Sequence, residues 1–472
     1  MVDNLCCTRP HLIRMIDFKI NPTIARFCVL LIPWILTLAW LKLSRPPRWR
    51  MIGALLAFLW QLPALFLINA AAVRLNLWSF YGTHMLFFGT PVDLVLGWAA
   101  LWGGFWVLAF HRLKIQWMLL LALLFDLIII PLLSPLIQLG KYWLIGEALL
   151  LALALLPALI LARWTEQRTH LEGRMTLIAI GWAGLFLFLL PGTLLAQSGG
   201  DIFSIFALGI FETIIALLLL LPPIALAFAA VREFTLHGGG TPLPFDPPKR
   251  LIITGPYAYV SNPMQLATLI IYIIMACIYS DFTLLLIPIV LWIFSIGFTW
   301  WYEGEEMRRR FGKSWSYYRK KVPSWVPRWQ PYLPKASTFK LGNDSLSLVF
   351  QNWLGDEEFT ALDFKSSTDD DSKENTSKQS RSLYRASDGA EECGLSALAH
   401  ALEHIHILYA WLGWILRLPI LRPILERALT LLIPSILSIQ TRRRQRADYD
   451  HQVDSDLLDI DPFEEDEKSL KS

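Results

Sequence analysis

Long apolar runs separated by short polar or basic stretches form the main pattern of this chain. The runs lie at about 27–43, 51–70, 92–110, 116–138, 144–163, 175–196, 203–230, 264–280 and 282–301. Most of them are long enough for a helix to cross the hydrocarbon core of a bilayer, about 30 Å thick. Helices satisfy all of their backbone groups without water, so the pattern predicts an all-α polytopic membrane protein of about nine transmembrane helices. The stretch 71–91 is more mixed, and we expect it to be re-entrant or interfacial.

Composition supports this prediction. Of the 472 residues, 55% are hydrophobic and 17% are charged, and the mean hydropathy is +0.45. A soluble protein of this length is less apolar. The net charge of +3 gives no reason to expect nucleic-acid binding, and the five cysteines include no Cys-x-x-Cys pair. This argues against a disulfide scaffold and against a zinc module.

Basic residues gather in particular loops. The loops rich in Lys and Arg are 42–50, 111–114, 163–174, 231–250 and 308–321, whereas 197–201 and 279–281 are not basic. Short basic loops remain on the cytoplasmic side of a membrane. We therefore expect these loops and the C-terminal half in the cytoplasm, the N-terminus outside, and a bacterial cytoplasmic membrane as the location.

Changes in composition divide the chain into five regions. We expect a multi-span membrane region at 1–230, a catalytic region with a helical hairpin at 231–335, a polar and partly disordered linker at 336–395, amphipathic membrane-associated helices at 396–440 and a charged tail at 441–472. The linker contains the polar sequence KSSTDDDSKENTSKQSRS. The apolar run that follows it has Arg417 near its middle, which favours a hairpin on the membrane surface over a clean span.

Two polar elements flank the last two apolar runs. The first is GPYAYVSNPMQ (255–265), a turn stiffened by Pro256 and Pro263. The second, 303–318, begins with Glu303, Glu305 and Glu306. The short connection at 279–281 makes the intervening runs an antiparallel pair. We therefore expect the two polar elements to meet at one face of the membrane.

The side chains of these elements suit a nucleoside cofactor. Aromatic rings and amides can hold an adenine, and a carboxylate accepts two charge-assisted hydrogen bonds from ribose hydroxyls. Aromatic faces and carboxylates also stabilise a sulfonium cation. A simpler interpretation also exists, in which Glu305 and Glu306 pair with the arginines at 308–310 on a solvated helix end.

Taken together, the two elements resemble the catalytic C-terminal region of isoprenylcysteine carboxyl methyltransferases and related membrane phospholipid methyltransferases. The family pattern is GPYxYxRHPxYxG, a helical hairpin, then EExxLxxxFGxxYxxYxxxVPxxxP. The resemblance covers residues 238–331 and rests on Gly255, Pro256, Tyr257, Tyr259 and Pro263, then Glu305, Glu306, Phe311, Gly312, Trp315, Tyr318, Val322, Pro323 and Pro327.

This resemblance implies S-adenosylmethionine as the cofactor, held between the turn and the acidic helix. A lipophilic or prenylated small molecule or a lipid would enter from the membrane as methyl acceptor. The cofactor-binding residues that it implies are Gly255, Pro256, Tyr257, Tyr259, Asn262, Pro263, Gln265, Glu305, Glu306 and Tyr318, and the catalytic ones are Glu305, Glu306 and Asn262. The expected protein is an integral membrane methyltransferase, with no metal and no nucleic-acid partner.

Three positions depart from the family pattern. Ser261 and Asn262 replace an Arg-His pair, Gln265 replaces a tyrosine, and Ala267 stands where glycine is usual. Asn262 and Gln265 keep the capacity to hydrogen-bond a cofactor. Transfer to a carboxylate or thiolate needs no base, whereas transfer to an amine or hydroxyl would use Glu305 or Glu306.

Two other classes of protein stay open. An NADPH-dependent sterol- or steroid-type reductase has a similar helical architecture, although this turn carries no cation for a 2′-phosphate. A non-catalytic scaffold or transporter would keep the fold after losing the Arg-His pair. The glutamate pair and the Phe311-Gly312 sequence argue against complete decay.

A fainter resemblance concerns residues 383–429, which are similar to the end of the small thioredoxin-like domains of the DCC thiol-disulfide oxidoreductase type. Those domains begin with a Cys-x-x-Cys, which this chain lacks. The resemblance therefore implies a redox-inactive remnant. His400, His404 and His406 can in principle bind a metal with Glu403, but we expect an amphipathic helix with these histidines at the membrane surface.

Three carboxylates interrupt the apolar runs, namely Asp126, Glu147 and Glu212. Intramembrane carboxylates are functional candidates. They also occur near helix ends or bonded to a neighbouring helix, and the sequence leaves both interpretations open.

Overall fold

The computed structural model describes residues 21–81, 86–134, 136–241, 248–294, 304–354, 357–365, 381–387, 389–419 and 421–429. Glu303, the N-terminal 20 residues and the predicted charged tail at 441–472 lie outside this part of the chain. The chain forms two compact units. Unit 1 is Met1–Thr213 with Met275–Leu286, and unit 2 is Ile214–Ile274 with Ile287–Ser472.

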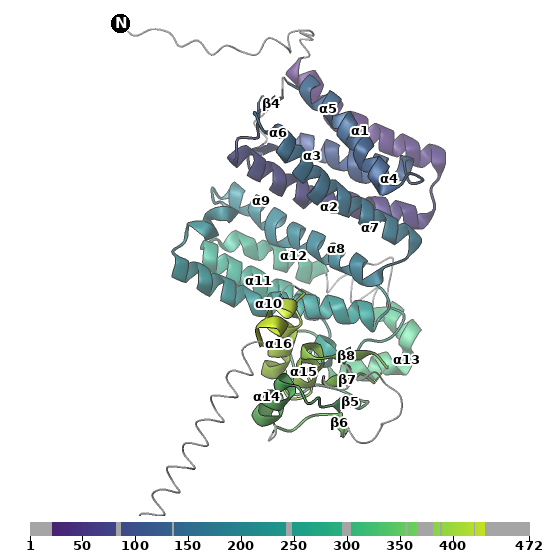
Figure 1. Cartoon of the computed structure of the whole chain (residues 1–472), viewed down its shortest axis with the longest axis vertical. Coiled ribbons are helices and arrows are strands. Elements are labelled where there is room, and N and C mark those ends of the chain that lie inside the picture. The colour runs from purple at the N-terminus through teal and green to yellow at the C-terminus, as the bar shows by residue number, and fades with distance from the viewer. Residues whose placement is uncertain are drawn as a thin grey trace, which may run out of the picture. The chain divides into compact units, whose positions relative to one another are not determined.

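Unit 1 is a bundle of long apolar helices (Figure 1). Its helices are α1 (Pro22–Ser44), α2 (Arg48–Arg74), α3 (Val92–Ala99), η1 (Ala100–Phe105), α4 (Trp106–Ala109), α5 (Ile115–Leu132), α6 (Trp143–Leu149), η2 (Leu150–Leu155), α7 (Leu156–Gln167), α8 (Leu171–Ala183), η3 (Gly184–Leu189), α9 (Leu190–Gln197) and η4 (Ile202–Ala207). The π-helical segments η1, η2 and η3 each continue the helices on either side, so three long runs result.

Small residues let these helices approach closely. A Cβ on Gly53 would lie 2.8 Å from the Ala162 carbonyl oxygen, so glycine is needed where α2 crosses α7. Ala57, Ala154 and Ala158 are completely buried in the same core. Association through small residues is the usual solution for helices in lipid, where the hydrophobic effect gives little driving force between them.

Two short ribbons close one end of the bundle. Strand β1 (Trp78–Phe80) pairs antiparallel with β4 (Ile137–Leu139), and β2 (Leu86–Phe87) pairs with β3 (Thr90–Pro91). The mixed stretch 71–91 therefore holds the end of α2 and three strand segments within its described residues.

Unit 2 contains most of α10 (Ile210–Leu236), then η5 (Gly255–Ala258), α11 (Pro263–Tyr279), α12 (Leu286–Phe294) and α13 (Gly304–Lys321). The short η6 (Phe282–Leu285) precedes α12. Apolar residues of α10, the η5 turn, α11 and the C-terminal α16 (Ile407–Leu416) form one core around Tyr259 and Trp414.

The C-terminal part of unit 2 is a four-stranded sheet with helices, in the strand order β6-β5-β7-β8. Its strands are β5 (Ser337–Lys340), β6 (Leu362–Lys365), β7 (Leu383–Arg385) and β8 (Glu391–Cys393), and its helices are α14 (Ser345–Leu354) and α15 (Leu395–Leu402). Strands β5 and β6 are parallel and joined through α14, whereas β7 pairs antiparallel with β5 and β8 with β7.

This sheet differs from the polar linker expected over 336–395. Strand β5 alternates buried Ser337 and Phe339 with half-buried Thr338 and Lys340, which is the pattern of a strand with one covered face. Four residues are too few to stand out beside the polar stretch 366–380, which lies outside the described residues. The predicted surface hairpin differs as well, because every residue of α15 is buried.

The all-α membrane fold is confirmed in its main features, with these small strands as the exception. Seven described helices or helix runs are long and apolar enough to cross a membrane: 22–44, 48–74, 92–109, 115–132, 143–167, 171–197 and 210–236. The last two predicted spans correspond to shorter apolar helices, Pro263–Tyr279 and Phe282–Ile293 within the described ranges. A bent pair, Ile407–Leu416 with Leu421–Leu429, would make an eighth candidate.

Candidate functional site

The Gly255 turn packs against the end of α10. Gly255 has a φ of +56°, a left-handed conformation that glycine adopts without strain. A Cβ at this position would lie 2.5 Å from Cγ of Glu233. Both the backbone conformation and the close neighbour therefore require glycine at this position of the turn.

Hydrogen bonds join this turn to the segment that follows the helical hairpin. The Tyr318 hydroxyl donates to the Tyr257 carbonyl at 2.9 Å, and the Ser261 amide donates to the Pro323 carbonyl at 2.8 Å. The amides of Arg328 and Tyr332 donate to the carbonyls of Tyr259 and Ala258 at 3.0 and 2.9 Å. The two parts of the sequence pattern thus meet in unit 2. Burial raises the pKa of the Tyr318 hydroxyl, which stays a neutral donor.

The tyrosines of the turn point into the protein. Tyr257 is 9% exposed and Tyr259 is completely buried. The Tyr259 hydroxyl donates to the Glu403 carbonyl at 2.9 Å, and its ring meets Trp414 edge to face. Tyr259 therefore anchors the C-terminal sheet region to the turn.

Asn262, Pro263 and Gln265 lie where the turn becomes α11. Pro263 is the first residue of that helix, a favourable place because its missing N–H has no helical partner there. The Asn262 carbonyl accepts the first helical hydrogen bond, from the Leu266 amide at 3.0 Å. Asn262 and Gln265 are both half-buried, and their role toward a cofactor stays a prediction.

Glu305 and Glu306 begin α13 and face arginines one turn later. Glu305 accepts from Arg309 and Glu306 from Arg310, each at 2.7 Å, and the two carboxylates are 58% and 40% exposed. No hydrogen bond connects either carboxylate to the turn among the residues that the structure describes. Farther along, Gly312 departs from helical geometry with φ +54° and ψ −127°, so α13 has a break before Tyr318.

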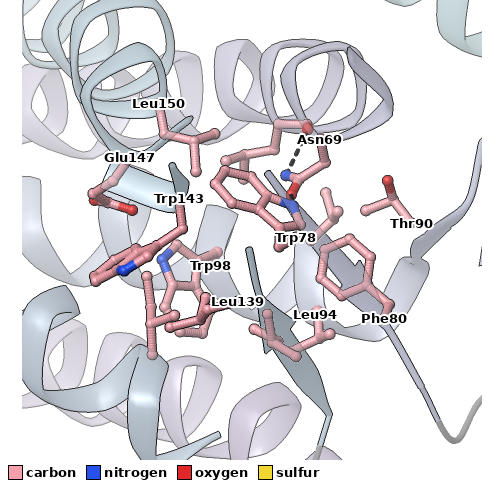
Figure 2. Close-up of a pocket in the computed structure, with 14 residues that line it drawn as sticks. Asn69, Trp78, Phe80, Thr90, Leu94, Trp98, Leu139, Trp143, Glu147 and Leu150 are labelled. Carbon is pink, nitrogen blue, oxygen red and sulfur yellow. Dashed lines mark hydrogen bonds between the residues drawn. The ribbon is translucent and has the colours of Figure 1, made fainter. Parts of the chain in front are cut away.

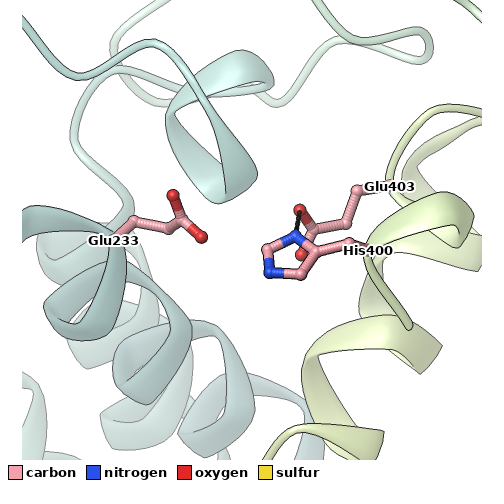
Figure 3. Close-up of side chains that lie close together, drawn as sticks. All are labelled: Glu233, His400 and Glu403. Atoms are coloured by element: carbon pink, nitrogen blue, oxygen red, sulfur yellow. Dashed lines mark hydrogen bonds and ion pairs between the residues drawn. The ribbon is translucent and has the colours of Figure 1, made fainter. Parts of the chain in front are cut away.

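A buried group of charged residues lies beneath the turn. We call Glu233, His400, Glu403 and Arg417 the buried ion cluster; Figure 3 shows Glu233 on α10 facing His400 and Glu403 from the C-terminal region. Arg417 contacts Glu403 directly and lies 3.6 Å from a Glu233 oxygen. Glu233 also accepts from the Thr254 hydroxyl at 2.9 Å. A small cavity of about 10 Å³ lies among these residues.

The charged side chains of this cluster pair with one another and form an ion network. Glu233, His400 and Glu403 each offer a ligand atom within 4.8 Å of the others, a spacing that suits a metal ion. Arg417, however, supplies a cation to the same group, since it bonds to both Glu403 and His400. Burial and the Arg417 charge lower the pKa of His400, which favours a neutral imidazole.

Neighbouring groups extend the network. Arg232 pairs with Glu392 on β8. Burial opposes ionisation of Glu392, but its hydrogen bond with His400 and the charges of Arg232 and Arg417 outweigh burial and lower its pKa. The structure therefore ties the end of α10 to β8, α15 and the end of α16 through paired charges.

The histidines are buried, which corrects the expected position at a membrane surface. His400 and His404 are 4% and 2% exposed. His406 has a different environment from these two histidines, because its ring stacks on Trp329 with ring centroids 4.5 Å apart. The difference arises because α15 is apolar and is buried on all sides, so His400 on this helix is buried with it.

Sequence reasoning missed Glu233 as a partner of the tail and treated Arg417 only as a charge that breaks an apolar run. Both charges lie at the ends of apolar helices, α10 and α16, which is the available sequence signal. Their pairing depends on a fold that brings residues 184 positions apart together, and spacing along the chain does not reveal it.

Comparison with protein families gives one match. Residues 211–314 match the family model of phospholipid methyltransferases. The match covers α10, the turn, the hairpin and the first part of α13. Comparisons with curated proteins and with solved structures give no match.

The apolar helices indicate an integral membrane protein, and the family match indicates a region similar to phospholipid methyltransferases, most of it in unit 2. The match ends before Tyr318 and does not include the C-terminal sheet, and of unit 1 it covers only residues 211–213 and Met275–Leu286. The similarity of residues 383–429 to DCC-type domains therefore stays a prediction.

Proposed function

We propose that unit 2 binds S-adenosylmethionine and transfers its methyl group to a lipophilic acceptor. The observation that carries this proposal is the set of hydrogen bonds that joins the Gly255 turn to the Tyr318–Tyr332 segment, where the sequence matches or adjoins the methyltransferase family. These bonds hold the Gly255 turn beside the end of α13 and the segment that follows it, which supports a site shared by the two parts of the pattern.

Glu305 and Glu306 are the proposed ligands of the ribose hydroxyls. Both are accessible to solvent, and each must release its arginine to accept hydrogen bonds from a cofactor. Exposed i,i+4 pairs contribute only about 0.3–0.5 kcal/mol, so this exchange costs little. Asn262 and Gln265 are the proposed amide partners of the adenine, since both lie half-buried at the end of the turn.

The bound cofactor would supply an electrophilic methyl carbon on a sulfonium. The acceptor's lone pair forms the new bond as the carbon–sulfur bond breaks. An amine or hydroxyl acceptor must also lose a proton, for which Glu305 or Glu306 is the proposed base, whereas a carboxylate or thiolate needs none. The acceptor class expected from the apolar surroundings of α10 and α11 is a lipid or another membrane-soluble molecule.

The proposed orientation puts this site on the cytoplasmic side of a bacterial membrane. Two of the basic loops of unit 1 lie together, because Arg50 bonds to Glu166 at 2.7 Å and Arg168 lies over the Trp49 ring. This agrees with the alternation of basic loops from which the orientation is inferred.

The C-terminal sheet region is proposed to serve as a docking domain without redox activity. A parallel β–α–β unit followed by an antiparallel β–β–α unit supports the resemblance to thioredoxin-like domains. The turn into α14 carries Asp344 and Ser347, whose side chains bond to each other, and no cysteine. Redox chemistry of the thioredoxin type needs a pair of cysteines.

The test is calorimetric binding of S-adenosylhomocysteine to the full-length protein in detergent. We expect saturable binding by the wild type and at least a roughly tenfold loss in the Glu305→Gln, Glu306→Gln double variant, because two charge-assisted hydrogen bonds to ribose disappear. The matched control is Glu357→Gln, Glu358→Gln, another adjacent glutamate pair of unit 2 that lies outside the matched residues. It should bind as the wild type does.

Two other results would contradict the proposal. Binding of NADPH in place of S-adenosylhomocysteine would support the reductase class. Binding of neither nucleotide by a folded protein would support a scaffold that keeps the architecture alone.

A further inference from the structure

Unit 1 contains a cavity that the proposed methyl transfer does not use. It has a volume of about 60 Å³ and lies among the ends of α2, α3, α5 and α6 beneath the β1–β4 ribbon. Figure 2 shows the aromatic rings of Trp78, Phe80, Trp98 and Trp143 in its wall, with the Glu147 side chain beside Trp143. Aliphatic side chains form most of the remaining surface.

Two carboxyl groups, one lining this cavity and one close to it, have no cation beside them among the residues that the structure describes. Glu147 lines the cavity and is 1% exposed, and Asp126 on α5 is completely buried. Neither carboxyl makes a hydrogen bond of ordinary geometry with any residue that the structure describes. The two groups are close enough to interact electrostatically. Among the described residues, the carboxyl oxygens at the cavity therefore have no donor in ordinary hydrogen-bond geometry, although the Trp98 side chain lies near Asp126.

Such an arrangement is costly without a ligand. Buried polar groups are almost always hydrogen-bonded, and an isolated carboxylate in an apolar environment is strongly destabilised. The other lining polar side chains do not relieve it. Asn69 uses its amide, since it accepts from the Trp78 indole N–H at 3.0 Å and donates to the Leu65 carbonyl at 2.8 Å.

We propose that this cavity binds an organic ammonium ion, such as a methylated amine headgroup. Aromatic faces attract a weakly hydrated cation through their quadrupoles, and this attraction is stronger where the contact is desolvated. A volume of 60 Å³ corresponds to roughly four to six water-sized positions, which suits a methylated ammonium group. A hard inorganic cation would need six or so oxygen ligands, more than this apolar wall offers.

The residues have separate roles in this site. Glu147 supplies the negative charge, with Asp126 beside it, and Trp98 and Trp143 supply ring faces. Gly146 permits the close approach of Trp78, because a Cβ at Gly146 would lie 2.2 Å from Cζ3 of that ring. The site depends only on unit 1 and is independent of the proposed methyl transfer.

The test is a calorimetric titration of the full-length, detergent-solubilised protein with tetramethylammonium chloride. We expect saturable binding by the wild type and a roughly tenfold or greater loss in Glu147→Gln, since the neutral amide keeps the shape and removes the charge. Glu212→Gln is the control, because Glu212 is an exposed carboxylate on α10 and does not line the cavity. It should leave the affinity unchanged.

Specificity and folding are checked in parallel. Potassium chloride at the same concentrations should neither bind nor compete, and equal binding of potassium would overturn the assignment to an organic ammonium. The melting temperature of Glu147→Gln should equal or exceed that of the wild type, since the variant removes a buried charge. Should that variant fail to fold, Trp143→Leu keeps both carboxyls and must also weaken binding. Unchanged affinity in a folded Glu147→Gln or Trp143→Leu variant, or no binding by the wild type, overturns the proposal.

Discussion

Two separate constraints favour glycine at position 255. Its φ of +56° and the Glu233 side chain next to it both leave no place for a Cβ. Glu233 is part of the buried ion cluster, so a displacement there also disturbs charges that are sheltered from water. A backbone detail of the turn is therefore coupled to electrostatics deeper in unit 2.

Gly255→Ala should destabilise unit 2 by more than backbone strain alone. The strain of a left-handed alanine costs about 1 kcal/mol, and displacement of Glu233 adds to it. The control is Gly389→Ala, at another glycine of positive φ with no atom within 4 Å of its added Cβ. The apparent melting temperature in detergent measures both changes. Equal losses in the two variants would show that the contact with Glu233 has no energetic effect.

His404 gives unit 2 a dependence on pH. Burial lowers the pKa of His404 from the ordinary value of 6.5 to about 4, although its hydrogen bond with the Thr360 carbonyl acts in the opposite direction. Its Nδ1 faces the Thr360 carbonyl at 2.7 Å, and its Nε2 lies 3.0 Å from the Tyr384 hydroxyl. Because the carbonyl can only accept, the neutral ring carries its hydrogen on Nδ1.

The sign of this pH effect follows from the lowered pKa. As the pH falls below about 6.5, His404 becomes protonated in the unfolded chain. In the folded chain His404 becomes protonated only near pH 4. The contribution is complete above pH 6.5 and is lost between these values, by on the order of 3 kcal/mol. Denaturant unfolding at a series of pH values measures it. His404→Gln should remove this share of the slope, and an identical slope in the variant would contradict the assignment.

At the scale of secondary-structure elements, the buried ion cluster joins α10 to α15 and α16. Truncating one member leaves its partner charged and buried, so Arg417→Met should cost about 3–5 kcal/mol. Glu403→Gln should also destabilise, but the double variant should cost less than the sum, because each change removes the partner that the other left unpaired. Melting temperatures of the four proteins in this cycle measure the coupling.

An exposed pair provides the comparison. Arg385 bonds to Glu391 on the surface, with 56% and 44% of the side chains exposed, so Arg385→Met should cost less than about 1 kcal/mol. Additive losses for Glu403→Gln and Arg417→Met would mean that the two side chains do not act as a unit.

Elements whose signal lies within one stretch of sequence were predictable, and those that depend on distant partners were not. The helices of unit 1 follow from long apolar runs, as α2 and α5 illustrate. Strand β5 has four residues, and its partners β6 and β7 are far along the chain. The sequence therefore indicated the membrane helices and missed the sheet.

The same distinction holds for the site. The meeting of Tyr257 with Tyr318 was expected from two linked sequence elements and is present in the structure. The pairing of Glu233 with Arg417 was not expected, because nothing near Glu233 in sequence indicates a partner in the tail. Local geometry such as the positive φ of Gly255 agrees with the predicted turn, whereas its contact with Glu233 becomes visible only in three dimensions.

On the scale of the whole molecule, two compact units contain two different kinds of site. Unit 2 has the stretch that matches phospholipid methyltransferases, and unit 1 has the aromatic cavity with unpaired carboxyl groups. Separate assays can address them, since the proposed ammonium site and the proposed cofactor site share no residue. We expect the Glu305→Gln, Glu306→Gln double variant to lose only cofactor binding. We expect the Glu147→Gln variant to lose only ammonium binding.

The long sequence separation between the charges at the end of α10 and their partners also has a consequence for biosynthesis. Arg232 leaves the ribosome 160 residues before its partner Glu392, an interval of roughly ten to thirty seconds at usual rates of translation. During that interval the end of α10 presents Arg232 and Glu233 to its surroundings without the partners that later neutralise them. A chain that stops before residue 392 keeps the complete methyltransferase-like stretch and still exposes these charges, so we expect cellular quality control to degrade it.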